Sequence, residues 1–365
     1  MAALAPRTAP AYRVGVILGD GIGPEIMDSA LAVLEAAVGP MLEIHPEEAG
    51  ARYYEKTGEP MSAATLARIR THYDAVLKGP VGLPGVRQPD GTEAGVISGI
   101  LRTGLDAYAN VRPVSAFAGM SGAGEATGAR GVIDYVIVRE NTEGLYASRG
   151  LGIGNDRVRV DQLLVTRESV ERVVRFAFRL ARSRGGAPAD GKRRVTCVDK
   201  SNVLRSYALF RSVFGEVAAE FPDVEADYRY ADAAGHDLVA APERFDVLVM
   251  ENFLGDILSD VGAATVGGLG MCGAANIGDR YAYFEPVHGS APALAGSDQA
   301  NPTAQILAAA MMLDHLGEQW AATALRRAVR DAFASGAVRL TGSGCAEGGT
   351  RAFTRAVIGM LAGRP

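Results

Sequence analysis

Short apolar runs rich in β-branched residues alternate along the chain with longer stretches that place apolar residues at helical spacing. The short runs span residues 12–18, 132–138, 194–198 and 245–250, and they predict strands. The longer stretches span residues 25–38, 167–183, 206–221 and 302–316, and they predict amphipathic helices. This alternation predicts an α/β architecture in which helices cover the strands of a sheet.

The segments between these elements carry fewer structural signals. Residues 118–131 are rich in Gly and Ala, and they predict a loop. Residues 157–165 alternate polar and apolar side chains, which predicts an exposed β-arm suited to a dimer interface, or equally a plain surface hairpin.

A glycine-rich segment, Gly19-Asp20-Gly21-Ile22-Gly23-Pro24-Glu25, joins the first predicted strand to the first predicted helix. A dinucleotide-binding fingerprint would need glycine where Pro24 stands, and an acidic strand end about 20 residues further on, which is missing. The segment therefore predicts a tight strand-to-helix turn beside the site, with the fingerprint as the alternative.

Size and composition narrow the class of protein. A chain of 365 residues that is 48% hydrophobic suits two lobes or two domains with a sizeable core. The formal charge of −5 and the scattered basic residues argue against nucleic acid as a partner, although a few placed arginines can still bind an anionic substrate.

Three distant cysteines favour neither a disulfide framework nor a thiolate zinc site. Since no secretory signal or run of about 18 apolar residues occurs, we expect a cytoplasmic protein that does not span a membrane.

The segment Glu251-Asn252-Phe253-Leu254-Gly255-Asp256-Ile257-Leu258-Ser259-Asp260 is the strongest local signal for chemistry. It follows an apolar strand directly, at the end where α/β proteins place their sites. Asp256 and Asp260 are four residues apart, so a helix sets both carboxylates on one face. Mg²⁺ or Mn²⁺ would relieve their repulsion, and a solvated helix face with two acids is the alternative.

Arg102, Arg112 and Arg139 each stand in an apolar or compact stretch, where a guanidinium needs a carboxylate partner. If they converge on one pocket, they suit a di- or tricarboxylate substrate, because Arg binds carboxylates bidentately. Three separate structural ion pairs are the alternative.

Two further segments carry candidate chemistry. Lys200 comes directly after the strand at 194–198, and near a metal and arginines it would serve as a base, although such a lysine is often only a surface residue. The loop from Glu285 to Pro292 is rich in Gly, Ser and Pro, and its backbone amides could hold an adenosine or a phosphate.

Taken together, these ordered motifs resemble the β-decarboxylating dehydrogenases, the family of isocitrate, homoisocitrate, 3-isopropylmalate and tartrate/D-malate dehydrogenases. The resemblance runs from Gly19 to the helix after Asn301-Pro302. It implies a two-lobed, isopropylmalate dehydrogenase-like α/β fold with a parallel or mixed sheet in each lobe and a cleft between them. We expect residues 1–107 and 267–365 to form the cofactor-side lobe, and residues 108–266 to form the smaller lobe with the dimerisation arm.

The resemblance also implies a role for each matching residue. The substrate would contact Ser98, Arg102, Arg112 and Arg139; the catalytic pair would be Tyr146 and Lys200; the metal ligands would be Asp232, Asp256 and Asp260; the cofactor would contact His288, Gly289, Ser290, Ala291 and Asn301. In the family the lysine and the first aspartate reach the site from the partner subunit, so we expect a homodimer with shared sites.

Two departures from the family pattern concern specificity. Ala293-Leu294 matches neither the Asp of NAD enzymes nor the Lys-Tyr of NADP-using isocitrate enzymes, and we expect NAD because no cation replaces the aspartate, with NADP not excluded. Ser98 and Gly99 stand where typical 3-isopropylmalate enzymes have leucines. The isocitrate pattern at 96 and 98, and the extra arginine near 99 of bacterial homoisocitrate enzymes, are also missing.

We therefore expect a Mg²⁺- or Mn²⁺-dependent oxidative decarboxylation of a 3-substituted malate. The Arg-Glu-Asn-Thr-Glu-Gly stretch and Ser98 favour an isocitrate- or homoisocitrate-like substrate with a polar γ-group. The alternatives are 3-isopropylmalate, a specialised malate such as a phosphonate, and a nucleotide-binding module without chemistry. A catalytically silent regulatory subunit would lack at least one of Tyr146, Lys200, Asp256 and Asp260, and all four are present.

Overall fold

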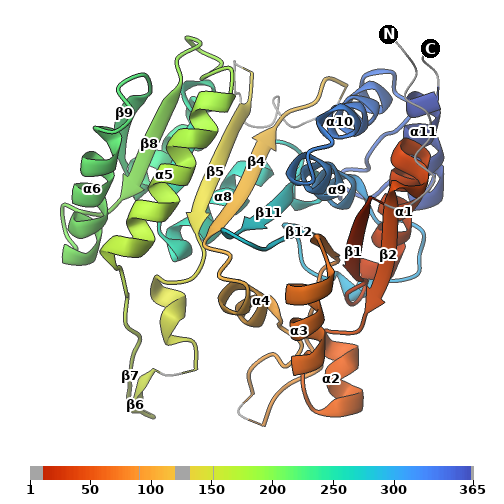
Figure 1. Cartoon of the computed structure of the whole chain (residues 1–365), viewed down its shortest axis with the longest axis horizontal. Helices are drawn as coiled ribbons and strands as arrows, with labels where there is room; N and C mark the ends of the chain where they lie inside the picture. The colour runs from red at the N-terminus through yellow and green to blue at the C-terminus, as the bar shows by residue number, and fades with distance from the viewer. Residues whose placement is uncertain (1–10, 90, 120–131, 151, 363–365) are drawn as a thin grey trace.

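The computed structural model of the chain describes residues 11–89, 91–119, 132–150 and 152–362. A ten-stranded sheet runs through the middle in the order β2-β1-β3-β12-β11-β4-β5-β10-β8-β9, with helices on both of its faces (Figure 1). The α/β class predicted from the alternation of strands and helices is confirmed.

The strands of this sheet combine two parallel blocks. They are β1 Tyr12–Ile17, β2 Leu42–Glu47, β3 Ala75–Lys78, β4 Ala109–Ser115, β5 Asp134–Glu140, β8 Arg194–Asp199, β9 Glu225–Tyr230, β10 Val247–Met250, β11 Gly273–Ile277 and β12 Ala282–Pro286. Strand β11 is antiparallel to β12 and β4, and β4 is antiparallel to β5. We expected one sheet in each lobe; instead the hydrogen bonds between β4 and β11 join the two blocks into one sheet, a long-range pairing that no local pattern reveals.

Helices cover both faces of the sheet. They are α1 Gly23–Val38, α2 Ala51–Thr57, α3 Ala63–His72, α4 Ser98–Gly104, α5 Arg167–Ser183, α6 Arg205–Ala218, α7 Ala231–Ala240, α8 Asn252–Ala264, α9 Thr303–His315, α10 Gln319–Ala334 and α11 Thr350–Ala362. The four predicted helices and four predicted strands all occur, with bounds that differ by three residues or fewer. Helix α5 begins where expected, because the Thr166 side chain accepts a hydrogen bond from the Ser169 amide.

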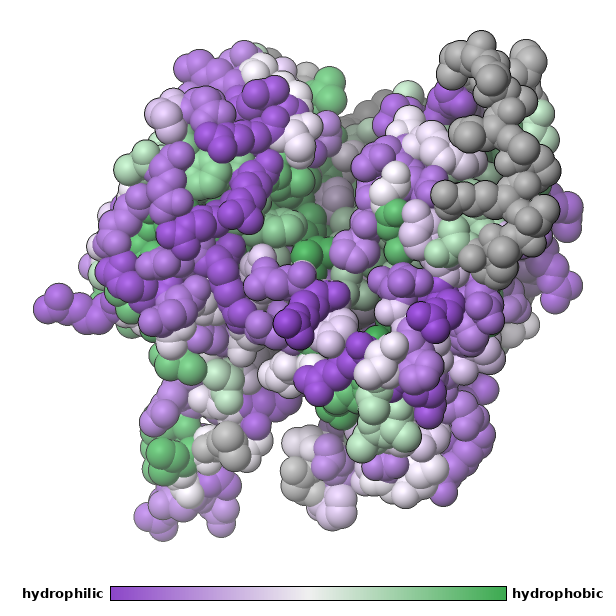
Figure 2. All heavy atoms as spheres, viewed as in Figure 1, coloured by the Kyte–Doolittle hydropathy of each residue, from purple (hydrophilic) through white to green (hydrophobic). Residues whose placement is uncertain are grey.

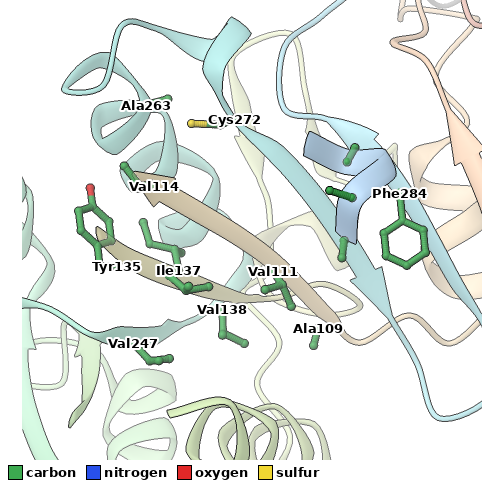
Figure 3. Packing of buried hydrophobic residues seen from close by; sticks show 14 of the residues in the cluster. Ala109, Val111, Val114, Tyr135, Ile137, Val138, Val247, Ala263, Cys272 and Phe284 are labelled. Carbon is green, nitrogen blue, oxygen red and sulfur yellow. The ribbon is translucent and has the colours of Figure 1, made fainter. Parts of the chain in front are cut away.

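The core explains why the central strands read as continuous apolar runs. All four residues of β10, Val247–Met250, are fully buried, as are Ile137 and Val138 of β5. Figure 3 shows these β5 side chains beside Val111 and Val114 of β4. A sheet covered by helices on both faces buries both sides of its strands, so the apolar residues do not alternate with polar ones.

The turn after β1 has the geometry predicted for a tight strand-to-helix connection. Gly19 and Gly21 have φ values of +81° and +59°, which favour glycine. A Cβ at Gly21 would lie 1.9 Å from the carbonyl oxygen of Ser290, so the turn packs directly against the loop after β12. The buried carboxylate of Asp20 accepts hydrogen bonds from the amides of Ala51 and Gly82, both at 2.8 Å.

The predicted β-arm is confirmed as an exposed hairpin. Strands β6 Ile153–Asn155 and β7 Val158–Val160 pair with each other and extend away from the main sheet (Figure 1). Their apolar side chains are largely exposed, at 64% for Ile153 and 55% for Val158. Of the loop predicted at 118–131, residues 120–131 lie outside the described part of the chain.

The face drawn in Figure 2 is mainly hydrophilic. In Figure 2 the molecule is hollowed between the half that carries β5, β8 and β10 and the half that carries α9, α10 and α11. No helix in the described ranges is long and apolar enough to cross a membrane. The residue boundaries of the two expected lobes stay a prediction.

Candidate active site

Strands β4 and β5 aim two of the predicted arginines at the same face of the sheet. Their antiparallel register pairs Asn110 with Arg139, and Arg112 lies two residues beyond Asn110. Paired residues, and residues two apart on a strand, point to the same face. Arg112 and Arg139 are therefore neighbours, with 8% and 1% of their side-chain surfaces exposed.

Helix α4 contributes the third arginine. Arg102 and Ser98 are one helical turn apart, and both line a cavity of about 200 Å³ that Arg112 and Asp256 also line. The Nε atom of Arg102 is buried and has no hydrogen-bond partner within the described chain. The structure thus places Ser98, Arg102 and Arg112 around one cavity with Arg139 next to Arg112, and their contact with a substrate stays a prediction.

The two sheet arginines are held by side chains from α8. Arg112 donates from Nη1 to Ser259 at 2.6 Å, and Arg139 donates from Nε and Nη2 to the Asn252 side-chain oxygen at 3.0 and 2.7 Å. Gly255 makes this approach possible, because a Cβ there would lie 2.5 Å from Cγ of Arg139. Asn252 and Ser259 were not predicted, although both lie in the segment that the sequence singled out.

Asp256 forms the centre of this ion network. Its Oδ1 accepts from Nη1 of Arg139 and lies 3.6 Å from Nη2 of Arg112. Asp260, one turn later, lies 3.7 Å from Nη1 of Arg112. Burial by itself would raise the pKa of Asp256, but Arg139 and Arg112 outweigh it and lower the pKa.

The environment of Asp260 favours a cation. Burial raises the pKa of Asp260, and the Asp256 carboxylate adds to the rise, while Arg112 opposes it. Two carboxylates on one face of α8 supply the oxygen ligands that Mg²⁺ and Mn²⁺ prefer. The donor chemistry of this pair therefore fits a divalent cation.

The third predicted metal ligand lies elsewhere in the chain. Asp232, at the start of α7, accepts a hydrogen bond of 2.7 Å from Nζ of Lys200, and this bond lowers the pKa of Asp232. Both side chains are open to solvent, at 73% and 33% exposure. Over the described ranges no three His, Cys, Asp or Glu residues are close enough to hold a metal ion. Within one chain, Lys200 and Asp232 thus pair with each other. Their contribution to the active site of a partner subunit stays a prediction.

Tyr146 lies in the 3₁₀ helix η2 Leu145–Ser148 and faces Asp256. Its hydroxyl donates to Oδ2 of Asp256 at 2.8 Å, and its ring packs edge-on against Phe253. Burial and this hydrogen bond both raise the pKa of Tyr146. Tyr146 therefore stays protonated at neutral pH and can donate a proton.

Glu251 positions η2 against α8, and the sequence analysis assigned it no role. Its carboxylate caps α8 by accepting from the Phe253 amide at 2.8 Å, and it accepts from the Leu145 amide at 3.1 Å. The Tyr207 hydroxyl donates to the same carboxylate at 3.0 Å. An acidic residue directly before the first helical residue is the signal that could have revealed this cap.

A buried ion pair forms one wall of the cavity and was also missed. Nζ of Lys78, the last residue of β3, lies 2.6 Å from the Glu285 carboxylate. Asn276 donates to the same carboxylate at 2.9 Å. Burial by itself would raise the pKa of Glu285, but Lys78 and Arg102 reverse the shift and lower it. The available signal was a lysine at the end of a short apolar strand, directly before Gly79-Pro80.

The predicted cofactor residues fall into two groups. His288 lines the cavity, its Nε2 is buried without a partner in the described chain, and Gly289 has open space around its Cα. Ser290 is buried and its hydroxyl donates to the Gly82 carbonyl, while Ala291 adopts a left-handed φ of +38°. Asn301 is buried, and its side-chain oxygen accepts from Thr303 at the start of α9. Ser290 thus holds the loop in place, Asn301 binds the start of α9, His288 lines the cavity, and Gly289 leaves open space beside it.

Comparison with known proteins identifies the chain's relatives. The family model for isocitrate/isopropylmalate dehydrogenase matches residues 13–357. The chain belongs to this family. The chain is 44% identical over 326 residues to a 3-isopropylmalate/3-methylmalate dehydrogenase of Methanocaldococcus jannaschii, an alignment that covers 89% of this chain and 92% of the relative. It is 43% identical over 349 residues to a 3-isopropylmalate dehydrogenase of Frankia casuarinae, with 93% and 96% covered.

Solved structures agree with this membership of the isocitrate/isopropylmalate dehydrogenase family. The isocitrate dehydrogenase from Methylococcus capsulatus superimposes with a TM-score of 0.84 at 40% identity, and the match covers 96% of this chain and 99% of that one. A beta-decarboxylating dehydrogenase from Thermococcus kodakarensis superimposes with a TM-score of 0.79 at 38% identity. The family resemblance inferred from the motifs is confirmed, and the protein is a decarboxylating dehydrogenase that acts on a CH–OH group.

Proposed function

We propose that this protein uses NAD to oxidise the C2 hydroxyl of a 3-substituted malate and releases the 3-carboxylate as CO₂, in a reaction that requires Mg²⁺ or Mn²⁺. The observation that carries this proposal is the cluster of three arginines around Asp256: Arg102 and Arg112 line the same cavity as Asp256, and Arg139 pairs with the Asp256 carboxylate. A malate carries two carboxylates, and guanidinium groups bind carboxylates through paired hydrogen bonds.

The electrostatics of the cavity support an anionic ligand. Burial and repulsion from Arg102 and Arg112 lower the pKa of Arg139 to about 9. A bound carboxylate would offset this repulsion and supply the missing acceptor for Nε of Arg102. An anionic substrate thus completes a site that the protein's own acids neutralise only in part.

The chain carries a residue that can accept, and another that can donate, each proton transferred in the reaction. Lys200, in the partner's site of a homodimer, would take the proton from the C2 hydroxyl, and a bound nicotinamide would supply the hydride acceptor. A divalent cation held by Asp256, Asp260 and the partner subunit's Asp232 would stabilise negative charge on the C2 oxygen. Arg102, Arg112 and Arg139 hold the carboxylates, so the bond to the 3-carboxylate is oriented for loss of CO₂. Tyr146, protonated and adjacent to Asp256, then donates its proton to C3.

Exposed apolar side chains support the homodimer that this arrangement needs. Val203 and Leu204, just after Lys200, are 67% and 45% exposed, and Ile257 beside Asp256 is 51% exposed. The arm formed by β6 and β7 adds Ile153 and Val158. Exposed apolar residues gathered around candidate site residues are typical of a surface that another chain covers.

The loop after β12 supports NAD over NADP. Ala293 is exposed and Leu294 partly so, and neither can pair with the additional phosphate of NADP. A cation normally binds that phosphate.

The substrate candidates differ in whether the group on C3 is polar or apolar. Ser98 and the charged residues around it make the cavity wall largely polar, which favours a polar group on C3. The second candidate is 3-isopropylmalate, and it is favoured by the names of the relatives from Methanocaldococcus jannaschii and Frankia casuarinae.

The test is the formation of NADH or NADPH by the purified protein with Mn²⁺. The substrate panel contains isocitrate, homoisocitrate, 3-isopropylmalate, D-malate, tartrate and a phosphonate-bearing malate. We expect turnover of at least one 3-substituted malate with NAD, and loss of turnover in Lys200→Met. The absence of turnover with every malate, for a folded and metal-loaded protein, would refute the proposal.

A further inference from the structure

The guanidinium of Arg149 lies against the start of α4, next to a residue that lines the cavity. Nη1 of Arg149 is 3.3 Å from the position that a Cβ of Gly99 would occupy. Gly99 stands between Ser98, which lines the cavity, and Ile100, and it lies three residues before Arg102. Since Gly99 has no side chain, the Arg149 guanidinium lies directly against the backbone of α4, next to Ser98.

Arg149 has no acidic partner in the described ranges of the chain. Arg112 and Arg139, by contrast, both pair with the Asp256 carboxylate and donate to side-chain oxygens of α8. The contact of Arg149 is with an aromatic ring: its Cζ lies 5.7 Å from the centre of the Tyr146 ring, and Cζ of Arg139 lies at the same distance from that ring. The ring of Tyr146 thus holds Arg149 beside the site and leaves its donors free.

We propose that Arg149 determines specificity by binding an anionic group at the end of the substrate's C3 substituent. This inference rests on the proposed function and extends it, because it assigns the substrate class to malates whose third substituent carries a negative charge. A substituent that extends past Ser98 towards Gly99 would come within reach of the Arg149 guanidinium. A carboxylate and a phosphonate share this chemistry, since Arg binds both through paired hydrogen bonds.

The test compares substrates of different charge in wild type and in Arg149→Met. The anionic substrates are isocitrate and a phosphonomethyl-substituted malate, which distinguish the two sources of negative charge, and the uncharged counterpart is 3-isopropylmalate. The matched control is Arg327→Met, which removes the same charge from an exposed position on α10. Binding of each substrate to the Mn²⁺-loaded protein without nicotinamide is measured by calorimetry as a readout independent of turnover.

We expect Arg149→Met to lower kcat/KM for the better anionic substrate by about 10- to 100-fold, the range for a hydrogen bond to a charged group. The loss falls on KM and on the calorimetric affinity, and 3-isopropylmalate changes by less than about threefold. Arg149→Lys retains part of the preference, because it keeps the charge but not the paired donors. Arg327→Met changes neither substrate's kinetics.

Three results would overturn the inference. An equal fall in kcat for charged and uncharged substrates would show that Arg149 only supports Tyr146. An unchanged preference in Arg149→Met would remove Arg149 from recognition, and a wild-type enzyme that prefers 3-isopropylmalate to both anionic substrates would refute the substrate class. In each case the wild type still turns over a 3-substituted malate, so the proposed function stands; if the wild type turns over none, both fall.

Discussion

The Tyr146 hydroxyl donates a hydrogen bond to Asp256 at 2.8 Å, and this bond links the candidate proton donor to a candidate metal ligand. The two residues are 110 positions apart in the chain. They meet because Glu251 binds both the amide that begins η2 and the amides that begin α8. A change at either residue is therefore expected to affect the other.

Tyr146→Phe removes the proton donor and keeps the ring. We expect kcat for oxidative decarboxylation to fall by about 100-fold or more, as for loss of a general acid, while the substrate affinity measured by calorimetry changes little. Tyr53→Phe on α2 is the matched control. Equal kcat in the Tyr146 variant and wild type would rule out Tyr146 as the proton donor.

Asp256→Asn removes one charge from the candidate metal pair. We expect Mn²⁺ affinity, measured by calorimetric titration, to fall at least tenfold, because a carboxylate ligand is replaced by a weaker neutral one. Thermal unfolding serves as the control for folding, since Asp256 also pairs with Arg139. A metal titration that matches wild type would show that the cation binds elsewhere.

Mn²⁺ binding should depend on pH through Asp260. Burial and Asp256 raise the pKa of Asp260 above its usual value of 3.8, and a cation binds only the deprotonated form. Affinity is therefore full above the raised pKa and is lost as the pH falls through it, which happens at a higher pH than for an ordinary aspartate. Asp260→Asn should bind Mn²⁺ more weakly, and the part of the pH dependence due to Asp260 should disappear. An unchanged pH profile in that variant would contradict this assignment.

Lys78→Met leaves the Glu285 carboxylate buried without its cation. We expect the free energy of unfolding to fall by about 3–5 kcal/mol, the usual cost of breaking a buried ion pair from one side. The double variant Lys78→Met/Glu285→Gln should recover part of this loss, since no unpaired charge is left. Denaturant unfolding of the single and double variants checks this, and a double variant less stable than the single one would be the contrary result.

Gly255→Ala tests why α8 carries a glycine in its interior. Alanine is favoured over glycine in a helix by about 1 kcal/mol, and Gly359→Ala on α11, where a Cβ meets nothing within 4 Å, should show that gain. At Gly255 the added Cβ would lie 2.5 Å from Cγ of Arg139, so we expect lower stability and weaker substrate binding. Chemical denaturation and substrate calorimetry on both variants distinguish the two effects.

Local spacing allowed a good part of this protein to be predicted from the sequence. The eight elements predicted from apolar periodicity all occur, because that periodicity depends only on which residues lie three, four or two positions apart. For the same reason the sequence placed Asp256 and Asp260 on one helix face. The positive φ at Gly19 and Gly21 also follows from a local requirement of the turn.

Long-range pairing decided the rest. The hydrogen bonds of β4 with β11 make one sheet out of two expected ones, and they join segments more than 150 residues apart. Contacts between distant segments also create the Lys78–Glu285 pair, place Arg149 against Gly99, and pair Lys200 with Asp232. Such contacts depend on the packing of whole elements against each other, which periodicity within a single element does not encode.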